Sequence, residues 1–403
     1  MATHEADVLT HTNPDTPCGD LMRRYWQPAA LSEELPSGGA PVPVRLLGEH
    51  LVAFRDGKGR PGLLGVHCSH RGADLSYGRV EDGGLRCIYH GWLYDIQGRC
   101  LDQPGESGGG EHRESIRHPA YPCVEKAGVI FAYLGPGEPP LLPNYEFLTV
   151  PQDQVFAIKL YNEANYLQGN EGNIDPVHLS FLHRKINAGD LTEKDLAPKV
   201  EVEITDFGVR ICTVRDTGPS ERYLRVSNFV YPNLSTFPGG VSRDGYSVNW
   251  HVPIDDTHHW KYTFTFERKK TLDKEVMRRG RSDMTSDYKP LRNKSNRYLQ
   301  NRESMTNESY TGIGFVFQAH DLCVVEGAGP IQDRSREHLT SSDKAIVAAR
   351  KLLLGAIKDL QDGRDAPHVI RDRKANNLLH LITGGKVIPS STDWKQYIEQ
   401  LTF

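Results

Sequence analysis

Four residues with metal-binding side chains lie in two short segments rich in glycine and aromatic residues. The first segment, HCSHRGADLSYG, supplies Cys68 and His70 in the spacing Cys-x-His. The second, RCIYHGWLYD, supplies Cys87 and His90 in the spacing Cys-x-x-His, and sixteen residues separate His70 from Cys87. Two thiolates and two imidazoles complete the ligand set of a metal centre, and each pair is close enough in sequence to share one loop.

Two kinds of metal centre use this ligand count. Tetrahedral zinc binds two Cys and two His. A Rieske [2Fe–2S] cluster places both Cys on one iron and both His on the other. Glycines and aromatics in both segments are typical of two loop tips that close over a cluster, not of a zinc finger with a helix. We therefore expect Cys68, His70, Cys87 and His90 to bind a Rieske cluster, with structural zinc as the alternative.

A second possible metal site lies in the segment GNEGNIDPVHLSFLH. His178 and His183 are five residues apart, and Asp175 precedes His178 by three. On a regular helix His183 is displaced from the face of the other two, so both histidines can bind one metal only through a distorted turn. Two His and one carboxylate form the facial triad of non-haem Fe(II) oxygenases. An upstream redox cluster favours this interpretation, because its electrons then have a destination.

The carboxylate of such a triad must come from elsewhere in the chain. The segment FVFQAHDLCVVEGAGPIQDR offers Asp321, Glu326 and Asp333. Asp321 lies in an apolar run, where an ionised carboxylate is costly unless it is paired or bound to a metal. We expect Asp321 to be the third iron ligand, and the alternative is a helix cap or a salt bridge.

The composition indicates a soluble globular chain in the cytoplasm. Its 403 residues suggest two or three domains, with 38% hydrophobic and 25% charged residues. No apolar run of about 18 residues and no apolar signal core occurs, so we expect no membrane contact. The net charge is −4 without a Lys/Arg block, which argues against a nucleic-acid partner. Seven widely spaced cysteines indicate reduced thiols.

The pattern along the chain divides it into three regions. We expect an N-terminal arm over residues 1–40, a domain of short strands with glycine-rich turns over 41–142, and a mixed domain over 143–403. The mixed domain begins with a strand and a helical stretch from about 162 to 182. Longer strands with alternating β-branched and aromatic residues follow, and then a helix in SSDKAIVAARKLLLGAIKDLQDG. The expected fold class is α+β.

At these residues the chain resembles the oxygenase component of Rieske non-haem iron oxygenases. The segments TPCGDLMRRYWQPAALSEELP, WHVPIDD and DLCVVEGAGPIQDRSREHLTSSD place the resemblance in the phthalate dioxygenase-like branch, which includes aryl O-demethylases. The resemblance covers nearly the whole chain and implies an all-β Rieske domain followed by a helix-grip catalytic domain. The implied assembly is a head-to-tail homotrimer. Two departures are Ser69, where proline is usual, and His320, where an amide-bearing residue is more typical.

The resemblance also implies the role of each candidate residue. Asp175 would connect a cluster histidine of the neighbouring subunit to the iron ligand His178. Of the strand arginines Arg210, Arg215, Arg222 and Arg225, Arg225 is the first candidate to pair with a substrate carboxylate. The implied metal ligands are the residues already identified: Cys68, His70, Cys87 and His90 for the [2Fe–2S] cluster, and His178, His183 and Asp321 for one mononuclear Fe(II).

The implied reaction uses O2 to hydroxylate, dihydroxylate or O-demethylate an aromatic compound. The chain contains no dinucleotide fingerprint and no plant-type ferredoxin spacing, so its electrons must come from a separate reductase. By resemblance this reductase is a flavin and iron–sulfur protein that uses NAD(P)H. The alternative is a Rieske-type electron carrier without oxygenase activity, but the length of the chain and the triad argue against it.

The surroundings of the cluster also predict its reduction potential. Respiratory Rieske proteins carry an extra Cys in each ligand loop and a Ser hydroxyl that bonds to a cluster sulfur. The corresponding residues here are Ala73, Tyr89 and Trp92. Because fewer hydrogen bonds to the sulfurs lower the potential, we expect a value near the low end of the Rieske range, about −150 mV.

Overall fold

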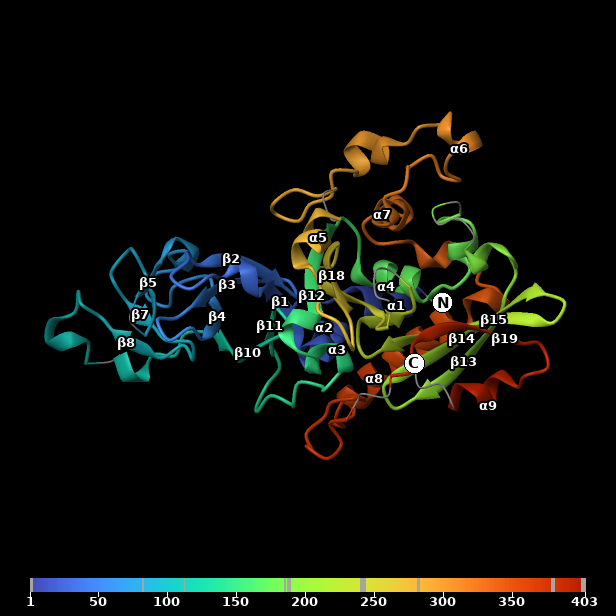
Figure 1. Ribbon diagram of the computed structural model, residues 1–403. Coiled ribbons are helices and arrows are strands. Elements are labelled where there is room, and N and C mark those ends of the chain that lie inside the picture. Colours follow the sequence, from blue (N-terminus) through green and yellow to red (C-terminus); the bar gives the residue numbers. More distant parts are fainter. Residues whose placement is uncertain are drawn as a thin grey trace.

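The structure is a computed structural model that describes residues 3–81, 83–111, 113–184, 186, 190–239, 244–280, 283–377 and 381–399. A small β-rich region projects from one side of a larger region of helices and strands (Figure 1). This arrangement confirms the expected α+β class. In the part of the chain so described, no helix is both long and apolar enough to cross a bilayer.

Three small antiparallel sheets build the N-terminal third of the chain. Their strand orders are β2-β3-β4-β9, β5-β6-β7-β8 and β1-β11-β10. The third sheet contacts β12 and β17 and so joins the two regions. The strands are β1 (Gln27–Leu31), β2 (Val42–Leu46), β3 (Glu49–Arg55), β4 (Pro61–Gly65), β5 (Arg79–Glu81), β6 (Gly84–Arg86), β7 (Leu93–Tyr94), β8 (Cys100–Asp102), β9 (Ala120–Tyr121), β10 (Cys123–Lys126) and β11 (Val129–Ala132).

One large antiparallel sheet forms the centre of the second region. Its order is β12-β18-β17-β16-β15-β14-β13, and β19 pairs with β15. The alternating β-branched and aromatic residues thus form strands as expected. These are β12 (Val155–Asn162), β13 (Lys199–Thr205), β14 (Gly208–Gly218), β15 (Glu221–Val230), β16 (Leu234–Phe237), β17 (Ser247–Asp255), β18 (His258–Phe266) and β19 (Gly384–Pro389).

Helices cover both faces of this sheet. Helices α4 and α8 pack on one face, where the apolar side of α8 joins Ile211 of β14 in the main core. On the other face Cys212 packs with Ile398 of α9. The helices are α1 (Thr3–Thr10), α2 (Pro17–Arg23), α3 (Glu146–Thr149), α4 (Tyr166–Ile174), α5 (Lys274–Arg279), α6 (Ser304–Asn307), α7 (Phe317–Gly327), α8 (Lys344–Gln361) and α9 (Trp394–Glu399).

Helix α4 ends earlier than the sequence predicted. We expected helical structure to about residue 182, but α4 stops at Ile174 and Asp175 has φ −80° and ψ 114°. The cause is Pro176, since proline disfavours the helical conformation of the residue before it. The chain then forms a short 3-10 turn over His178–Ser180. This break supplies the distorted turn that two histidines five residues apart require.

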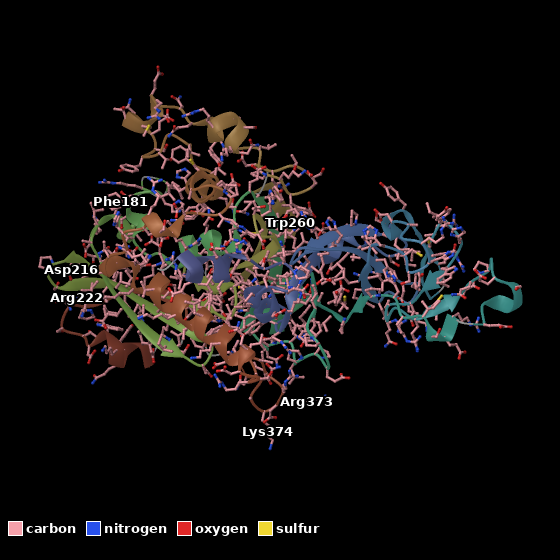
Figure 2. All side chains as sticks on the ribbon, turned by 180° about the vertical axis from the view of Figure 1, so that it is seen from behind. Phe181, Asp216, Arg222, Trp260, Arg373 and Lys374 are labelled. Carbon is pink, nitrogen blue, oxygen red and sulfur yellow. The ribbon has the colours of Figure 1, made fainter. Side chains whose placement is uncertain are left out.

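The tip of one hairpin and the junction of the two regions each carry a side-chain interaction. Asp216 and Arg222 form an ion pair of 3.0 Å at the tip of the β14–β15 hairpin, on the side away from the small β region (Figure 2). Trp260 lies near the junction of the two regions, where the Lys159 ammonium is 4.4 Å from the centre of its ring (Figure 2).

Candidate metal centres

The two segments that carry the first ligand set fold into loops with the same backbone hydrogen bonds. In each loop the Cys N–H donates to the carbonyl five residues later, Cys68 to Ala73 and Cys87 to Trp92. In each, a glycine N–H four residues on donates back to the Cys carbonyl. The two glycines, Gly72 and Gly91, have φ of +75° and +77°, a conformation that other residues rarely adopt. The glycines of the motif therefore close the loops.

These loops bring the four ligands together. The rings of His70 and His90 are 4.4 Å apart, edge to face, and both Nδ1 atoms are buried without a hydrogen-bond partner. Cys68 and Cys87 are buried at the base of the loops. A buried nitrogen without a partner is costly, so two of them beside two thiols fit a metal cluster bound through Nδ1. The histidine rings are only half-buried, so part of each reaches the surface.

Burial favours the protonated form of the Cys87 thiol in the absence of a metal. It raises the pKa of Cys87, and the neighbouring Cys68 raises it further, against the backbone amides of Tyr89 and His90, which donate hydrogen bonds to the thiol. Burial also lowers the pKa of His90. Thiolate and neutral imidazole are the forms that bind metal, so a cluster bound here would displace the proton of Cys87.

The second ligand set also converges. His178, His183 and Asp321 offer ligand atoms that all lie within 4.8 Å of one another. The Nδ1–H of His178 donates to the Asp175 carbonyl over 2.6 Å, which leaves its Nε2 as the ligand atom. Two imidazoles and a carboxylate are the donors that Fe(II) takes in oxygenases, so the residues fit a mononuclear iron.

Burial and neighbouring charges set the protonation states of Asp321 and His178 at this site. Burial opposes the ionisation of Asp321, but a hydrogen bond of 2.9 Å from His183 Nε2 and the nearby Lys261 hold its pKa down to about 2. Burial lowers the pKa of His178. The site therefore presents a carboxylate and a neutral imidazole, the forms that bind a divalent metal.

The other two candidate carboxylates have structural partners. Buried Glu326 accepts hydrogen bonds from the Tyr298 hydroxyl and the Glu163 amide, and Asp333 caps a short turn at Ser335. Of the three carboxylates that the sequence offered, Asp321 alone joins the histidines.

His320 connects the two chain segments that carry the iron ligands. Its ring is fully buried, with Nδ1 2.8 Å from the Leu182 carbonyl and Nε2 2.9 Å from the Gly314 carbonyl. Leu182 precedes His183, and His320 itself precedes Asp321. His320, the residue that departs from the family pattern, therefore links the chain just before His183 to the chain just before Asp321. The sequence showed that His320 is unusual but not what it contacts.

Asp175 lies on the rim of an open groove. The groove has a volume of about 320 Å³, and Val324 and Leu339 on its walls are half or nearly half exposed. Beneath it, Glu171 of α4 accepts hydrogen bonds from Arg334 over 3.0 Å and from Arg350 over 2.6 Å. These buried ion pairs fix the end of α4 that carries Asp175.

Arg225 and Arg215, two of the strand arginines that the sequence offered, have different environments. Arg225 donates to the Pro238 carbonyl over 2.9 Å. Arg215 is fully buried, and its Nη2 donates to the Pro176 carbonyl over 2.7 Å and to the Ser180 hydroxyl over 3.4 Å. Its Nε and Nη1 have no partner among the described residues. Burial lowers the pKa of Arg215 to about 10, and the charge of Arg225 adds to the effect. The five-residue spacing places Arg215 and Arg210 on opposite faces of β14, but it did not show which face is buried.

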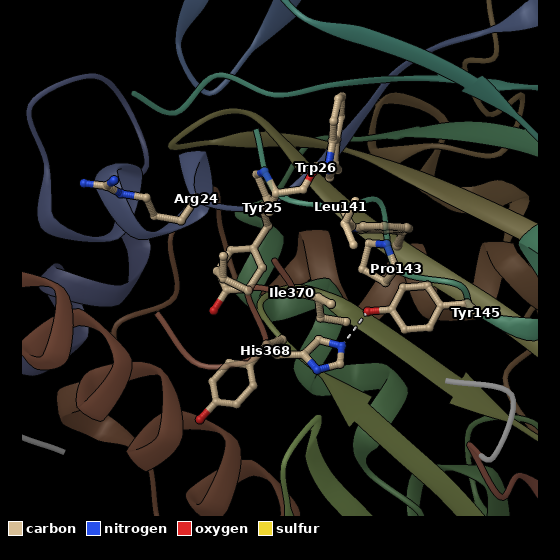
Figure 3. A pocket seen from close by; sticks show the side chains of 12 residues that line it. Arg24, Tyr25, Trp26, Leu141, Pro143, Tyr145, His368 and Ile370 are labelled. Carbon is tan, nitrogen blue, oxygen red and sulfur yellow. Dashed lines mark hydrogen bonds between the residues drawn. The ribbon is translucent and has the colours of Figure 1, made fainter. Parts of the chain in front are cut away.

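A second, enclosed space is too small for a substrate. It lies between Tyr25 and Trp26, the segment 140–145 and the segment 368–370, with a volume of about 10 Å³ (Figure 3). That is room for roughly one water molecule. The Tyr145 hydroxyl bonds to His368 Nε2 over 3.0 Å across it, and none of the metal ligands lines it.

Comparisons with known proteins agree with both centres. Residues 25–122 match the family described as the Rieske [2Fe-2S] domain, and residues 132–402 match the family described as LigXa C-terminal domain like. The chain is 34% identical to the phthalate 4,5-dioxygenase oxygenase subunit of Pseudomonas putida, over 98% of this chain and 95% of that protein. It is 32% identical to the 3-chlorobenzoate-3,4-dioxygenase oxygenase subunit of Comamonas testosteroni, over 99% and 98%.

A solved structure shares the fold. The terminal oxygenase of carbazole 1,9a-dioxygenase from Nocardioides aromaticivorans IC177 aligns with a TM-score of 0.62 and 20% identity, over 88% of this chain and 97% of that one. The arrangement of a Rieske domain and a catalytic domain is thus confirmed.

We predict that His320→Ala weakens iron binding at the mononuclear site. The variant loses the ring contact that ties the Leu182 segment to the Asp321 segment, as well as the contact with the Gly314 carbonyl. Loss of a residue that orients metal ligands costs about 10- to 100-fold in affinity. Iron retained after dialysis against a chelator should fall, while the visible absorption of the [2Fe–2S] cluster stays unchanged. His320→Gln, which can still donate to one carbonyl, should retain more iron. Equal iron retention in all three proteins would contradict the role.

Proposed function

Because the chain belongs to the oxygenase subunits of Rieske non-haem iron oxygenases, we propose that it uses O2 to hydroxylate, dihydroxylate or O-demethylate an aromatic carboxylic acid. The observation that supports this most is the presence of two complete metal-ligand sets in one chain. The electron-carrier alternative leaves the His178, His183 and Asp321 set without a purpose. When bound, the cluster supplies electrons and the mononuclear iron supplies the place where O2 and substrate meet.

The relatives are subunits of multicomponent oxygenases, so the enzyme needs an electron-donating partner. We propose a separate flavin and iron–sulfur reductase that uses NAD(P)H. The seven cysteines are free, which suits a cytoplasmic enzyme.

Metal analysis and product analysis together test the activity. The purified enzyme should contain about three irons and two sulfides per chain. With a flavin and [2Fe–2S] reductase, NADH and a panel of methoxylated and unmethoxylated aromatic acids, it should form diol, hydroxylated product or formaldehyde. Incorporation of label from ¹⁸O2 should identify oxygen insertion. His183→Ala should keep the cluster and lose the products. Product formation by His183→Ala, or a zinc protein without sulfide, would contradict the proposal.

Arg215 is the residue that best supports an anionic substrate. Its guanidinium contacts the Pro176 carbonyl at 2.7 Å and the Ser180 hydroxyl at 3.4 Å, and these two residues flank the iron ligand His178. Its Nε and Nη1 nitrogens are buried and meet no hydrogen-bond partner within the part of the chain that the structure describes. A buried cation without an anionic partner is costly, so a carboxylate bound beside the iron would relieve that cost.

The second arginine lies on the same face of the sheet. Arg225 pairs with Thr213 across β14 and β15, and Arg215 follows Thr213 by two residues. Side chains two residues apart share a face of a strand, so the two guanidinium groups are diagonal neighbours. Like charges side by side destabilise the empty site, and a carboxylate between them would be held in bidentate geometry. We therefore propose Arg215 as the main anchor and keep Arg225 as the second.

We predict that Arg215→Gln raises KM for an aromatic carboxylate by about 30-fold or more, because a hydrogen bond to a charged group contributes about 2 kcal/mol. KM for the matching neutral amide should change much less, and this difference separates substrate binding from a merely structural role. The control is Arg222→Gln, at the exposed hairpin tip. An equal rise of KM for acid and amide would argue that Arg215 only holds the loop around His178.

The position of the two centres supports a head-to-tail trimer. Within one chain the cluster loops adjoin β5 and β7 at the far end of the projecting region, away from α4 and α7 (Figure 1). The cluster loop carries exposed Ile88 and Tyr89, and the otherwise largely polar groove beside Asp175 carries exposed Val324 and Leu339. We propose that the cluster loops of a second copy dock in this groove. His90 of that copy then hydrogen-bonds Asp175, whose carbonyl already accepts from His178.

We predict that Asp175→Asn keeps both metals but lowers the rate of product formation roughly 100-fold, because an outer hydrogen-bond partner is lost. A single turnover of enzyme with a pre-reduced cluster measures this rate without the reductase. Mixing two inactive variants tests whether electrons pass from the cluster of one copy to the iron of the next. Cys87→Ser and His183→Ala should each be inactive alone, but trimers assembled from both should regain activity. Inactive mixed trimers, or a normal single turnover of Asp175→Asn, would refute the path.

A further inference from the structure

The two histidines of the iron site differ in how their rings are supported. The Nδ1–H of His178 donates to the Asp175 carbonyl, whereas Nδ1 of His183 is buried and has no hydrogen-bond partner in the part of the chain that the structure describes. Histidines that bind metals almost always donate their second ring N–H to an acceptor, which fixes the orientation of the ring. A contact of another kind must therefore hold the ring of His183.

The phenyl ring of Phe317 lies flat against this histidine. The planes of the two rings differ by 8°, and their centroids are 3.6 Å apart. We propose that Phe317 is a positioning residue, which holds the ring of His183 by stacking and so keeps its Nε2 directed at the metal. The proposal rests on iron binding at His178, His183 and Asp321, but not on any particular substrate.

The stack is the contact of His183 that persists when a metal binds. Without a metal, His183 Nε2 also lies 2.9 Å from Oδ1 of Asp321, and this hydrogen bond directs the nitrogen within the plane of the ring. A metal takes the place of the proton on Nε2, so the hydrogen bond ends on binding. Stacking needs neither ring nitrogen, and it resists tilting of the imidazole out of its plane in both states.

One face of α7 carries the residues that surround this ring. Phe317 precedes His320 by three residues and Asp321 by four, and side chains at these spacings are neighbours on a helix surface. The ring of His320 is also close to that of His183, with centroids 5.6 Å apart and planes 22° apart. The helix therefore brings the stacking ring and the carboxylate ligand to His183 together.

The core does not need Phe317 to hold α7 in place. The buried side of the helix packs through Ala319 and Leu322 against Leu160 of β12. Phe317 lies outside this cluster, and 38% of it is exposed. A large apolar side chain that remains so exposed contributes less to folding than a buried one. Its stacked position on His183 is thus better explained by the metal site than by the core.

The test compares Phe317→Leu with wild-type enzyme in the absence of substrate. Leucine keeps an apolar side chain but has no flat face, so mononuclear iron should be lost to a chelator about two- to tenfold faster, the range that an aromatic pair contributes. With Co(II) in place of this iron, the visible absorption bands should shift, because the orientation of one ligand changes. Phe317→Tyr and Phe317→Trp keep a flat face and should match the wild type in both measurements. Phe315→Leu, the same change at an exposed phenylalanine two residues away, is the matched control and should also match.

The outcomes separate positioning of the ligand from other roles of Phe317. A change in KM alone, with iron loss and the Co(II) spectrum as in the wild type, would mean that Phe317 only contacts substrate, and it would overturn the proposal. Equal iron loss from the Leu, Tyr and Trp variants would overturn it as well. If Phe317→Leu fails to fold, Phe317→Met replaces it, with the same expected loss of iron. Wild-type enzyme that holds the [2Fe–2S] cluster but no mononuclear iron would refute the metal site itself, and the role of Phe317 with it.

Discussion

The break between Asp175 and Pro176 is the constraint on which the catalytic site depends. Proline prevents Asp175 from continuing α4, and the chain turns so that the Asp175 carbonyl meets the Nδ1–H of His178. The same residue presents its carboxylate to the groove, where its side chain is 26% exposed. One backbone turn thus orients the ring of His178, the proposed iron ligand, and also exposes the Asp175 carboxylate at the surface. The ion pairs of Glu171 with Arg334 and Arg350 hold the helix end from which the turn departs.

The candidate ligands of the two metal centres are separated by very different distances along the chain. Each pair of cluster ligands lies within one loop, so local spacing alone carried the prediction of that site. The iron site joins His183 to Asp321, which is 138 residues away along the chain. Local patterns identified the two histidines and three candidate carboxylates, and the apolar run around Asp321, together with the family resemblance, favoured Asp321. The selection makes physical sense in the fold, because Glu326 and Asp333 already have partners.

The residues that sequence reasoning missed all act through long-range contacts. Tyr94 contacts Cys68, which is 26 residues away along the chain, and His118 contacts Ser69, which is 49 residues away. The burial of Arg215 depends on the loop at Pro176, and no spacing in β14 shows that contact. The premature end of α4 is a different case, since the Asp-Pro step at 175–176 was visible in the sequence and could have shortened the predicted helix.

The matching hydrogen bonds of the two cluster loops have a consequence for the speed of electron transfer. Both loops are closed by a Cys N–H bond to the carbonyl five residues on and by a glycine N–H bond back to the Cys carbonyl. Such a frame leaves the sulfur and nitrogen ligands little freedom to shift when the cluster charge changes. A centre whose surroundings barely rearrange between oxidation states has a low reorganisation energy, so electrons can enter and leave it with a small nuclear barrier.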